Sequence, residues 1–189
     1  MKVPRRPRLL GIDDGPFHKG SDATTPLVAV LMEGPDRIEG VALASFPVDG
    51  DDVTAFLARW IGGLRFRRAA HGVVLGGITL AGLAVVDLPA LARATGLPVM
   101  AVGRRDPSGH RVAEALRAAG LAARVPLLER TPQAFAAARG LHVAVAGAEP
   151  ERARALLLAA RAKSALPEPL RVAHLVAAAV ARGSSRGRA

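Results

Sequence analysis

The stretch Leu9–Pro16, which reads LLGIDDGP, contains the first expected strand of this 189-residue chain and the turn that follows it. It begins as an apolar run, which predicts a short buried strand, and it ends in two carboxylates and a Gly-Pro turn signal. Two further apolar runs, at 27–32 and 38–46, stand on either side of the short polar break Glu33–Asp36. That spacing predicts a hairpin. The chain is therefore expected to open with three antiparallel strands, the third lying beside the first.

Beyond residue 50 the sequence alternates between helical and strand patterns. Asp52 is expected to cap a helix whose apolar positions recur at helical spacing up to Gly62-Gly63. The expected order continues with strands at 72–75, 99–102 and 141–146 and helices at 87–95, 109–119, 149–162 and 167–182. This order predicts an α/β fold with a mixed sheet and helices on both faces. We expect one domain at 9–182, preceded by a basic arm at 1–8 and followed by a flexible tail at 183–189.

Composition limits the partners and the chemistry. With 26 Lys and Arg against 16 Asp and Glu, the formal charge of +10 favours a polyanionic partner, nucleic acid first. The alternative is that the arginines are ordinary solvated surface residues. The sequence contains no cysteine, which excludes disulfides, thiolate metal sites and a cysteine nucleophile. No stretch reaches the roughly 18–20 apolar residues of a membrane helix and no signal peptide fits the N-terminus, so we expect a cytoplasmic protein without a membrane partner.

Two carboxylates at strand ends form the predicted metal site. Asp13 ends the first strand and Asp49 follows the third, so the expected arrangement of the three strands brings them together. Oxygen ligands of this kind suit a hard divalent cation such as Mg²⁺ or Mn²⁺. The alternative is that Asp13 or Asp14 only shapes the turn before Gly15-Pro16.

The other candidate site residues are cations and one histidine. His174 and Arg171 lie three apart in the last predicted helix and share one of its faces. From spacing alone, a half-buried structural role suits His174 as well as a catalytic one. Arg104 and Arg105 follow the strand at 99–102, where a cation can meet phosphate, or they are ordinary loop charges. The five histidines include no HExxH-type pair, so a zinc hydrolase is not supported.

Six short motifs, in order along nearly the whole chain, resemble those of the endonuclease dU family. They are Gly11–Phe17, Val48–Thr54, Gly77–Gly82, Leu97–Val99, Pro167–Leu175 and Gly187–Ala189. The resemblance implies a ribonuclease H-like fold. It also implies a relationship to endonuclease V, a Mg²⁺-dependent enzyme that nicks nucleic acid near deaminated bases.

The same resemblance implies roles for individual residues. Asp13 corresponds to the metal carboxylate of the first strand, and Asp49 falls where endonuclease V has a glutamate after the third strand. His174 matches a histidine of the last-helix motif, and Arg104 falls near a catalytic lysine. We therefore expect Asp13, Asp49 and His174 to be catalytic, with the two aspartates as metal ligands. The arginines expected to bind substrate are Arg104, Arg105 and Arg171.

One departure from the family pattern bears on catalysis. The family carries a metal-binding Asp at the end of the fourth strand, where this chain has Gly76. Two hypotheses follow: a Mg²⁺-dependent endonuclease of DNA repair that acts on uracil- or inosine-type lesions, or a catalytically impaired relative that binds nucleic acid without cutting it. A small-molecule or phosphate-binding role for the same cleft is a third.

Overall fold

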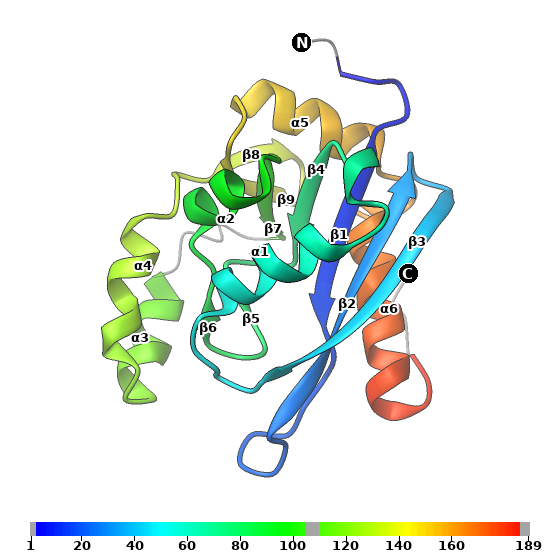
Figure 1. The fold of residues 1–189 in the computed structure, drawn as a ribbon. Coiled ribbons are helices and arrows are strands. Elements are labelled where there is room, and N and C mark those ends of the chain that lie inside the picture. Colours follow the sequence, from blue (N-terminus) through cyan, green and yellow to red (C-terminus); the bar gives the residue numbers. More distant parts are fainter. Residues whose placement is uncertain (1–2, 105–109, 186–189) are drawn as a thin grey trace.

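A seven-stranded mixed sheet forms the centre of the molecule (Figure 1). The computed structural model describes residues 3–104 and 110–185. The strand order across the sheet is β3-β2-β1-β4-β7-β9-β8. The bounds are β1 Arg8–Asp14, β2 Thr24–Glu33, β3 Arg37–Pro47, β4 Gly72–Leu75, β7 Val99–Gly103, β8 Phe135–Ala138 and β9 Leu141–Ala146. Two short strands, β5 (Thr79–Leu80) and β6 (Ala84–Val85), pair separately as a small hairpin.

The position of β1 in the sheet corrects one expectation. β1 pairs antiparallel with β2 and parallel with β4, so both of its edges are occupied. Val28 of β2 lies opposite Asp13 of β1 on one side and opposite Leu43 of β3 on the other. The expectation that the third strand lies beside the first is therefore wrong. The tight turn after β2 returns the chain along the edge of β2 that faces away from β1.

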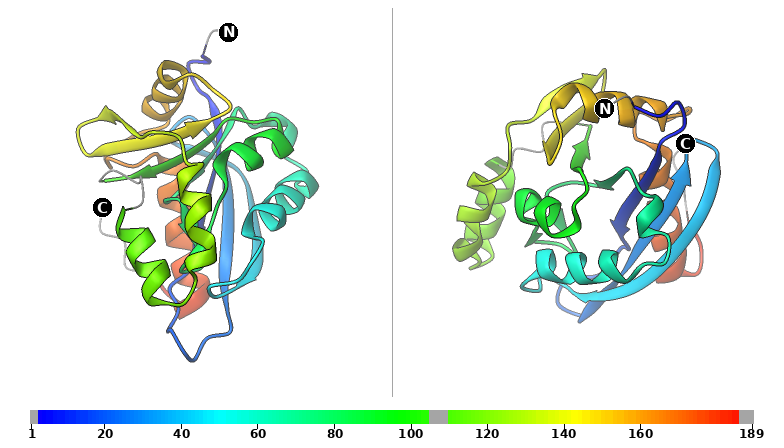
Figure 2. Two further views of the ribbon diagram at one scale, coloured as in Figure 1. Left: turned by 90° about the vertical axis from the view of Figure 1, so that its left-hand side faces the viewer. Right: turned by 45° about the horizontal axis from the view of Figure 1, so that its top comes forward.

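Helices cover both faces of the sheet, as predicted (Figure 2). They are α1 Val53–Gly63, α2 Leu88–Thr95, α3 His110–Ala118, α4 Val125–Glu129, α5 Pro150–Ala159 and α6 Glu168–Arg182, with 3₁₀ turns at Arg67–Ala69 and Ala122–Arg124. On one face, Leu57 of α1 and Leu91 of α2 pack into the core around Ile12. On the other face, Leu157 of α5 and Leu170 of α6 pack into a second apolar cluster. The predicted α/β class and the mixed sheet are confirmed.

Most predicted elements form where the pattern indicated, but several short ones were not predicted. The strands expected at 72–75 and 141–146 have those bounds. The β5–β6 hairpin was missed because strands of two residues carry no periodic signal, and β8 and α4 were missed as well. Asp52 precedes α1 as expected, but its side chain makes no capping hydrogen bond, and its backbone is left-handed with φ of 56°.

Gly11 allows α6 to pack directly on β1. A Cβ built at Gly11 would lie 2.2 Å from the carbonyl carbon of Pro169 and 2.4 Å from the amide nitrogen of Leu170. No side chain larger than hydrogen fits between the strand and the first turn of the helix. This close approach holds α6 against the strand that ends in Asp13, and it positions the candidate site.

The two ends of the chain are described in part. Arg6 pairs with Asp36, and Arg8 pairs with Glu39 at 2.7 Å and with Glu33 at 3.1 Å, so the predicted N-terminal arm is held against the β2–β3 turn from residue 6 onward. Residues 183–185 follow α6, and residues 186–189 of the predicted tail lie outside the described residues. None of the described helices has the length and apolar character needed to cross a membrane.

Candidate active site

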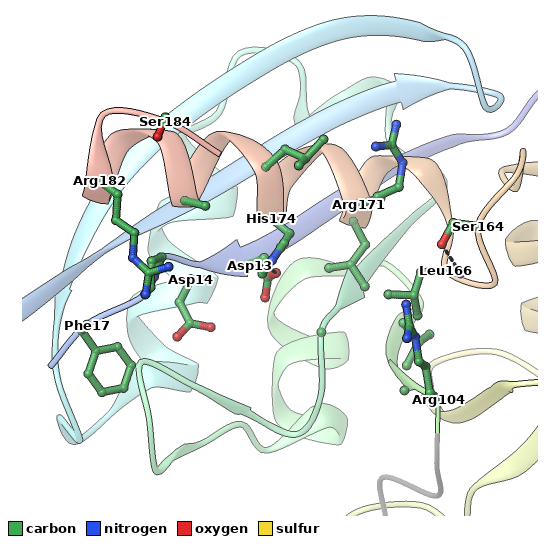
Figure 3. A pocket seen from close by; sticks show the side chains of 18 residues that line it. Asp13, Asp14, Phe17, Arg104, Ser164, Leu166, Arg171, His174, Arg182 and Ser184 are labelled. Carbon is green, nitrogen blue, oxygen red and sulfur yellow. Dashed lines mark hydrogen bonds and ion pairs between the residues drawn. The ribbon is translucent and has the colours of Figure 1, made fainter. Parts of the chain in front are cut away.

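A cavity of about 1050 Å³ opens at the C-terminal ends of the parallel strands β1, β4 and β7, with α6 as one wall (Figure 3). β1 contributes Asp13 and Asp14, the chain after β4 contributes Gly76, and the chain after β7 contributes Arg104. His174 reaches the cavity from α6. Ligands of α/β sheets bind at this edge because side chains from several strands converge there.

Asp13 and His174 form a hydrogen-bonded pair in this cavity. Oδ2 of Asp13 lies 2.8 Å from Nδ1 of His174, and the two side chains point toward one another from β1 and α6 (Figure 3). The Asp13 side chain is 16% exposed and that of His174 is 61% exposed, so the histidine faces the open cavity. The hydrogen bond that His174 donates to Asp13 raises the pKa of His174 above its ordinary value, and the negative charge of Asp13 adds to this shift. The structure thus brings together two of the three predicted catalytic residues.

Asp14 is a second carboxylate of the cavity, and sequence reasoning did not select it as a site residue. Burial raises its pKa to about 6, and the neighbouring charge of Asp13 adds to the shift. The backbone amide of Asp14 itself, the backbone amide of Ala81 and the charge of His174 offset part of that rise. The available signal was the position of Asp14 at the same boundary between apolar and acidic residues as Asp13.

Arginines line the cavity on both sides of the Asp13–His174 pair (Figure 3). Arg104 follows β7 and Arg182 ends α6, and neither forms an ion pair or a hydrogen bond with another residue in the described part of the chain. Arg171 also lines the cavity, but its guanidinium lies 2.6 Å from the buried carboxylate of Glu168. The predicted substrate-binding residue Arg105 lies outside the described residues. Sequence reasoning missed Arg182 because it stands among several arginines at the end of the chain.

Asp49 does not line the cavity. Its Oδ1 accepts a hydrogen bond from the backbone amide of Leu83 at 2.6 Å, and its own amide donates to the carbonyl of Ala81 at 2.8 Å. Both partners belong to the β5–β6 hairpin. The expected meeting of Asp13 and Asp49 rested on β1 and β3 being neighbours, and that basis is lost because β2 separates them.

The protein donors available to a metal ion in the cavity are few. Across residues 3–104 and 110–185, no three His, Cys, Asp or Glu side chains are arranged to hold an ion. A Cβ added at Gly76 would lie 2.7 Å from Oδ1 of Asp13, so a fourth-strand carboxylate would stand directly beside Asp13. Mg²⁺ is commonly held by one or two carboxylates, with water and substrate phosphates completing its shell. Oδ1 of Asp13, which does not take part in the bond to His174, and the carboxylate of Asp14, which also lines the cavity, are oxygen donors of the type that such a site uses.

Comparison with known proteins agrees with the motifs. Residues 5–181 match the endonuclease dU family. The chain belongs to this family. A UPF0215 protein of Methanothermobacter thermautotrophicus is 36% identical over 186 residues, which cover 96% of this chain and 91% of that protein. A UPF0215 protein of Deinococcus radiodurans is 37% identical over 188 residues, which cover 97% of this chain and 94% of that protein.

Solved structures place this endonuclease dU family member in a known fold. A protein of unknown function from Archaeoglobus fulgidus superimposes with a TM-score of 0.83 at 31% identity, over 93% of this chain and 98% of that one. Endonuclease V of Ciona intestinalis, crystallised with an inosine-containing 24mer DNA, superimposes with a TM-score of 0.55 at 12% identity, over 89% of this chain and 82% of that one. Endonuclease V of Streptomyces avermitilis has the same TM-score at 18% identity, over 91% of this chain and 80% of that one. The predicted ribonuclease H-like fold is confirmed.

Proposed function

We propose that this member of the endonuclease dU family hydrolyses phosphodiester bonds of DNA near uracil- or inosine-type bases, with Mg²⁺ or Mn²⁺ as cofactor. The observation that carries the proposal is the Asp13–His174 pair in a cavity flanked by the guanidiniums of Arg104 and Arg182, which have no partner among the described residues. The family to which the chain belongs supports the hydrolytic activity. The inosine in the DNA bound by the Ciona endonuclease V supports the class of lesion.

His174 is the residue best placed to handle protons. Its bond to Asp13 favours the tautomer that carries the proton on Nδ1, because a carboxylate accepts but does not donate when ionised. Nε2 then remains available to accept a proton from water, and once protonated it can donate to a phosphoryl oxygen. Asp13 fixes the orientation of the imidazole ring, and this part of the chemistry requires no other residue.

Asp13 and Asp14 are the residues that would hold the cation. A bound Mg²⁺ supplies charge that polarises a phosphoryl oxygen and stabilises the leaving oxygen. Because two carboxylates would leave most of the shell of a bound ion to water and substrate phosphates, the ion and the nucleic acid are expected to raise each other's affinity.

Arg104 and Arg182 suit a substrate with more than one phosphate. Figure 3 shows Arg104 beside Leu166 on one side of the pair and Arg182 with Phe17 on the other. A DNA strand that crosses the cavity can place phosphates near both guanidiniums. The cavity, at about 1050 Å³, has room for a base displaced from its stack.

Labelled DNA duplexes that carry a single deoxyuridine or deoxyinosine test this function. The wild-type protein is expected to nick them with Mg²⁺ or Mn²⁺ and to stop when EDTA is added. Asp13→Asn is expected to lose roughly a hundredfold or more in nicking rate while it still binds DNA. Asp36→Asn, whose carboxylate is exposed at the β2–β3 turn, is the matched control and is expected to nick as the wild type does. Nicking that survives Asp13→Asn contradicts the proposal.

A second candidate function is nucleic-acid binding without cleavage. The observation that favours it is Gly76, which leaves Asp13 without the adjacent carboxylate of the family pattern. In this case the same duplexes are bound with an affinity that falls steeply with salt, and neither metal ion produces nicks. The nicking assay therefore separates the two functions directly.

A further inference from the structure

The tip of the β5–β6 hairpin has an unusual backbone. Ala81 and Gly82, which form the turn, have φ of 48° and 93°, and Asp49, which touches this turn, has φ of 54°. A left-handed backbone at a residue other than glycine costs energy and persists where surrounding contacts hold it. Two such residues, Asp49 and Ala81, are hydrogen-bonded to each other at 2.8 Å. The contacts that hold this corner therefore matter for its shape.

The Asp49 side chain is fitted to the hairpin tip. Its Oδ1 accepts from the Leu83 amide at 2.6 Å. A Cβ added at Gly82 would lie 2.3 Å from the same oxygen, so the carboxylate occupies the space that a side chain at Gly82 would need. The Asp49 carboxylate therefore works as a wedge and hydrogen-bond acceptor beneath the turn.

Arg124 joins the same two segments from the 3₁₀ turn Ala122–Arg124. One guanidinium nitrogen donates to the carbonyl of Leu83 at 2.9 Å, and the other donates to the carbonyl of Asp49 at 2.6 Å. The second nitrogen also lies 2.6 Å from a carboxylate oxygen of Asp51. The Arg124 side chain is 11% exposed, so these bonds form where water competes little.

The hairpin tip supports one side of the candidate active site. The ring of Phe17, which lines the cavity, would come within 3.2 Å of a Cβ at Gly82, so ring and turn are in close proximity. The backbone of Ala81 also lies close enough to Asp14, another lining residue, to lower the pKa of its carboxyl group. Figure 3 shows Phe17 and Asp14 on the same side of the cavity. A shift of the hairpin would therefore move the support of both residues.

We propose that Asp49 and Arg124 form a latch that holds the β5–β6 hairpin in place, and that Asp49 is a positioning residue rather than a metal ligand. The latch keeps Phe17 and Asp14 in their places on the cavity wall. The consequence for hydrolysis rests on the proposed nuclease function, whereas the latch itself does not.

Asp49→Asn and Asp49→Gly are a matched pair that tests the latch. Both residues tolerate a left-handed backbone, but of the two only Asn keeps a side-chain oxygen to accept from the Leu83 amide. Asp49→Gly is expected to lower Tm by roughly 3–8 °C and to speed hydrogen exchange of the Leu83 amide roughly tenfold or more. Asp49→Asn is expected to resemble the wild type in both measurements. Asp51→Asn, which removes the charge of an exposed partner of the same guanidinium, is the control and is expected to change little.

The same variants in the nicking assay distinguish a latch from a metal ligand. A latch predicts that Asp49→Asn nicks within roughly threefold of the wild type and that Asp49→Gly is impaired mainly through a higher KM, because a displaced wall weakens substrate binding. A metal ligand predicts that both variants lose activity together, as Asp13→Asn does.

Two outcomes overturn the latch: equal Leu83 exchange rates in Asp49→Asn and Asp49→Gly, or loss of nicking in Asp49→Asn. If the wild type itself does not nick DNA, the proposed function fails, and the exchange and Tm measurements still decide whether the latch exists.

Discussion

Two regions of the molecule have similar local sequences but different surroundings. The Asp13 corner is the place where the end of β1 meets α6, and the Asp49 corner is the place where the chain after β3 meets the β5–β6 hairpin. Each aspartate stands at the end of a strand in the first third of the chain and is followed by a turn. Asp13 lies at the rim of a cavity with its carboxylate on His174. Asp49 lies in a left-handed turn with its carboxylate on a backbone amide of the hairpin.

The difference shows what decides the role of a carboxylate at a strand end. Asp13 is directed by the regular register of β1 with both neighbouring strands and by the helix packed on Gly11. Asp49 is directed by a segment more than thirty positions later in the chain, and by Arg124, which lies still further away. The first corner is built on the regular sheet and helix, whereas the second depends on contacts between loops.

Replacing Gly11 is expected to have the largest effect, because the close packing of α6 on β1 at this residue positions Asp13. A methyl group at Gly11 would overlap the backbone of Pro169, and strand and helix would have to separate. Gly11→Ala is expected to destabilise the protein by roughly 3 kcal/mol or more in urea unfolding. Gly62→Ala is the control, since nothing lies within 4 Å of a Cβ at Gly62, and it is expected to leave stability unchanged or slightly raised. Similar stabilities for the two variants would show that α6 does not depend on Gly11.

Restoring a carboxylate at position 76 tests whether Asp13 binds a metal ion. Gly76→Asp places a second negative charge beside Oδ1 of Asp13, which is expected to lower Tm in EDTA and to tighten Mg²⁺ binding roughly tenfold or more. Isothermal titration with Mg²⁺ and Tm as a function of Mg²⁺ concentration measure both effects. Gly76→Asn has the same shape without the charge and is the control. Equal Mg²⁺ affinity in the two variants would argue against an ion at Asp13.

Asp14 is expected to lower stability at neutral pH in the metal-free protein. Its pKa is raised by burial from 3.8 to about 6, so the folded state binds a proton more tightly than the unfolded state does. Stability is therefore lost as pH rises from about 4 to about 6 and stays reduced above that. Asp14→Asn is expected to stabilise the protein by about 1–3 kcal/mol at pH 7.5 in EDTA and to have little effect near pH 3.5. A gain that does not depend on pH would have a cause other than the charge.

Replacing Arg104 or Arg182 is expected to have the smallest effects, which are changes in the salt dependence of DNA binding. Arg104→Ala and Arg182→Ala, each in the Asp13→Asn background, are expected to lower the slope of log affinity against log salt by about 1 apiece. Fluorescence anisotropy with a labelled oligonucleotide across a NaCl series measures this slope. Arg93→Ala, which removes an exposed arginine outside the cavity, is the control. An unchanged slope in Arg182→Ala would show that Arg182 does not contact the DNA strand.

Much of the Asp13 corner could be predicted from sequence because it follows two regular periods. The strand pattern places Asp13 at a strand end, and helical spacing places His174 and Arg171 on one face of α6, where both line the cavity. The family motif adds a reason to pair Asp13 with His174. The overall α/β order could be predicted for the same reason.

The Asp49 corner could not be predicted, because its geometry comes from contacts that sequence spacing does not encode. The turn at Ala81 and Gly82 has positive φ at both residues and strands of two residues on either side. Strands this short show no periodic pattern from which the hairpin could be predicted. The order of the strands was also open: three antiparallel strands can place the third beside the first or beside the second. That choice separated Asp49 from Asp13.

Locating a bound ion tests directly whether Asp13, and not Asp49, binds the metal. Crystals of the wild-type protein grown with Mn²⁺ and a short DNA strand would show the ion in an anomalous difference map. We expect a peak at about 2.0–2.5 Å from Oδ1 of Asp13, with Asp14 and phosphate oxygens nearby and the Asp49 carboxylate still bonded to the Leu83 amide. A peak that bridges Asp13 and Asp49, with the Leu83 bond broken, would contradict this expectation.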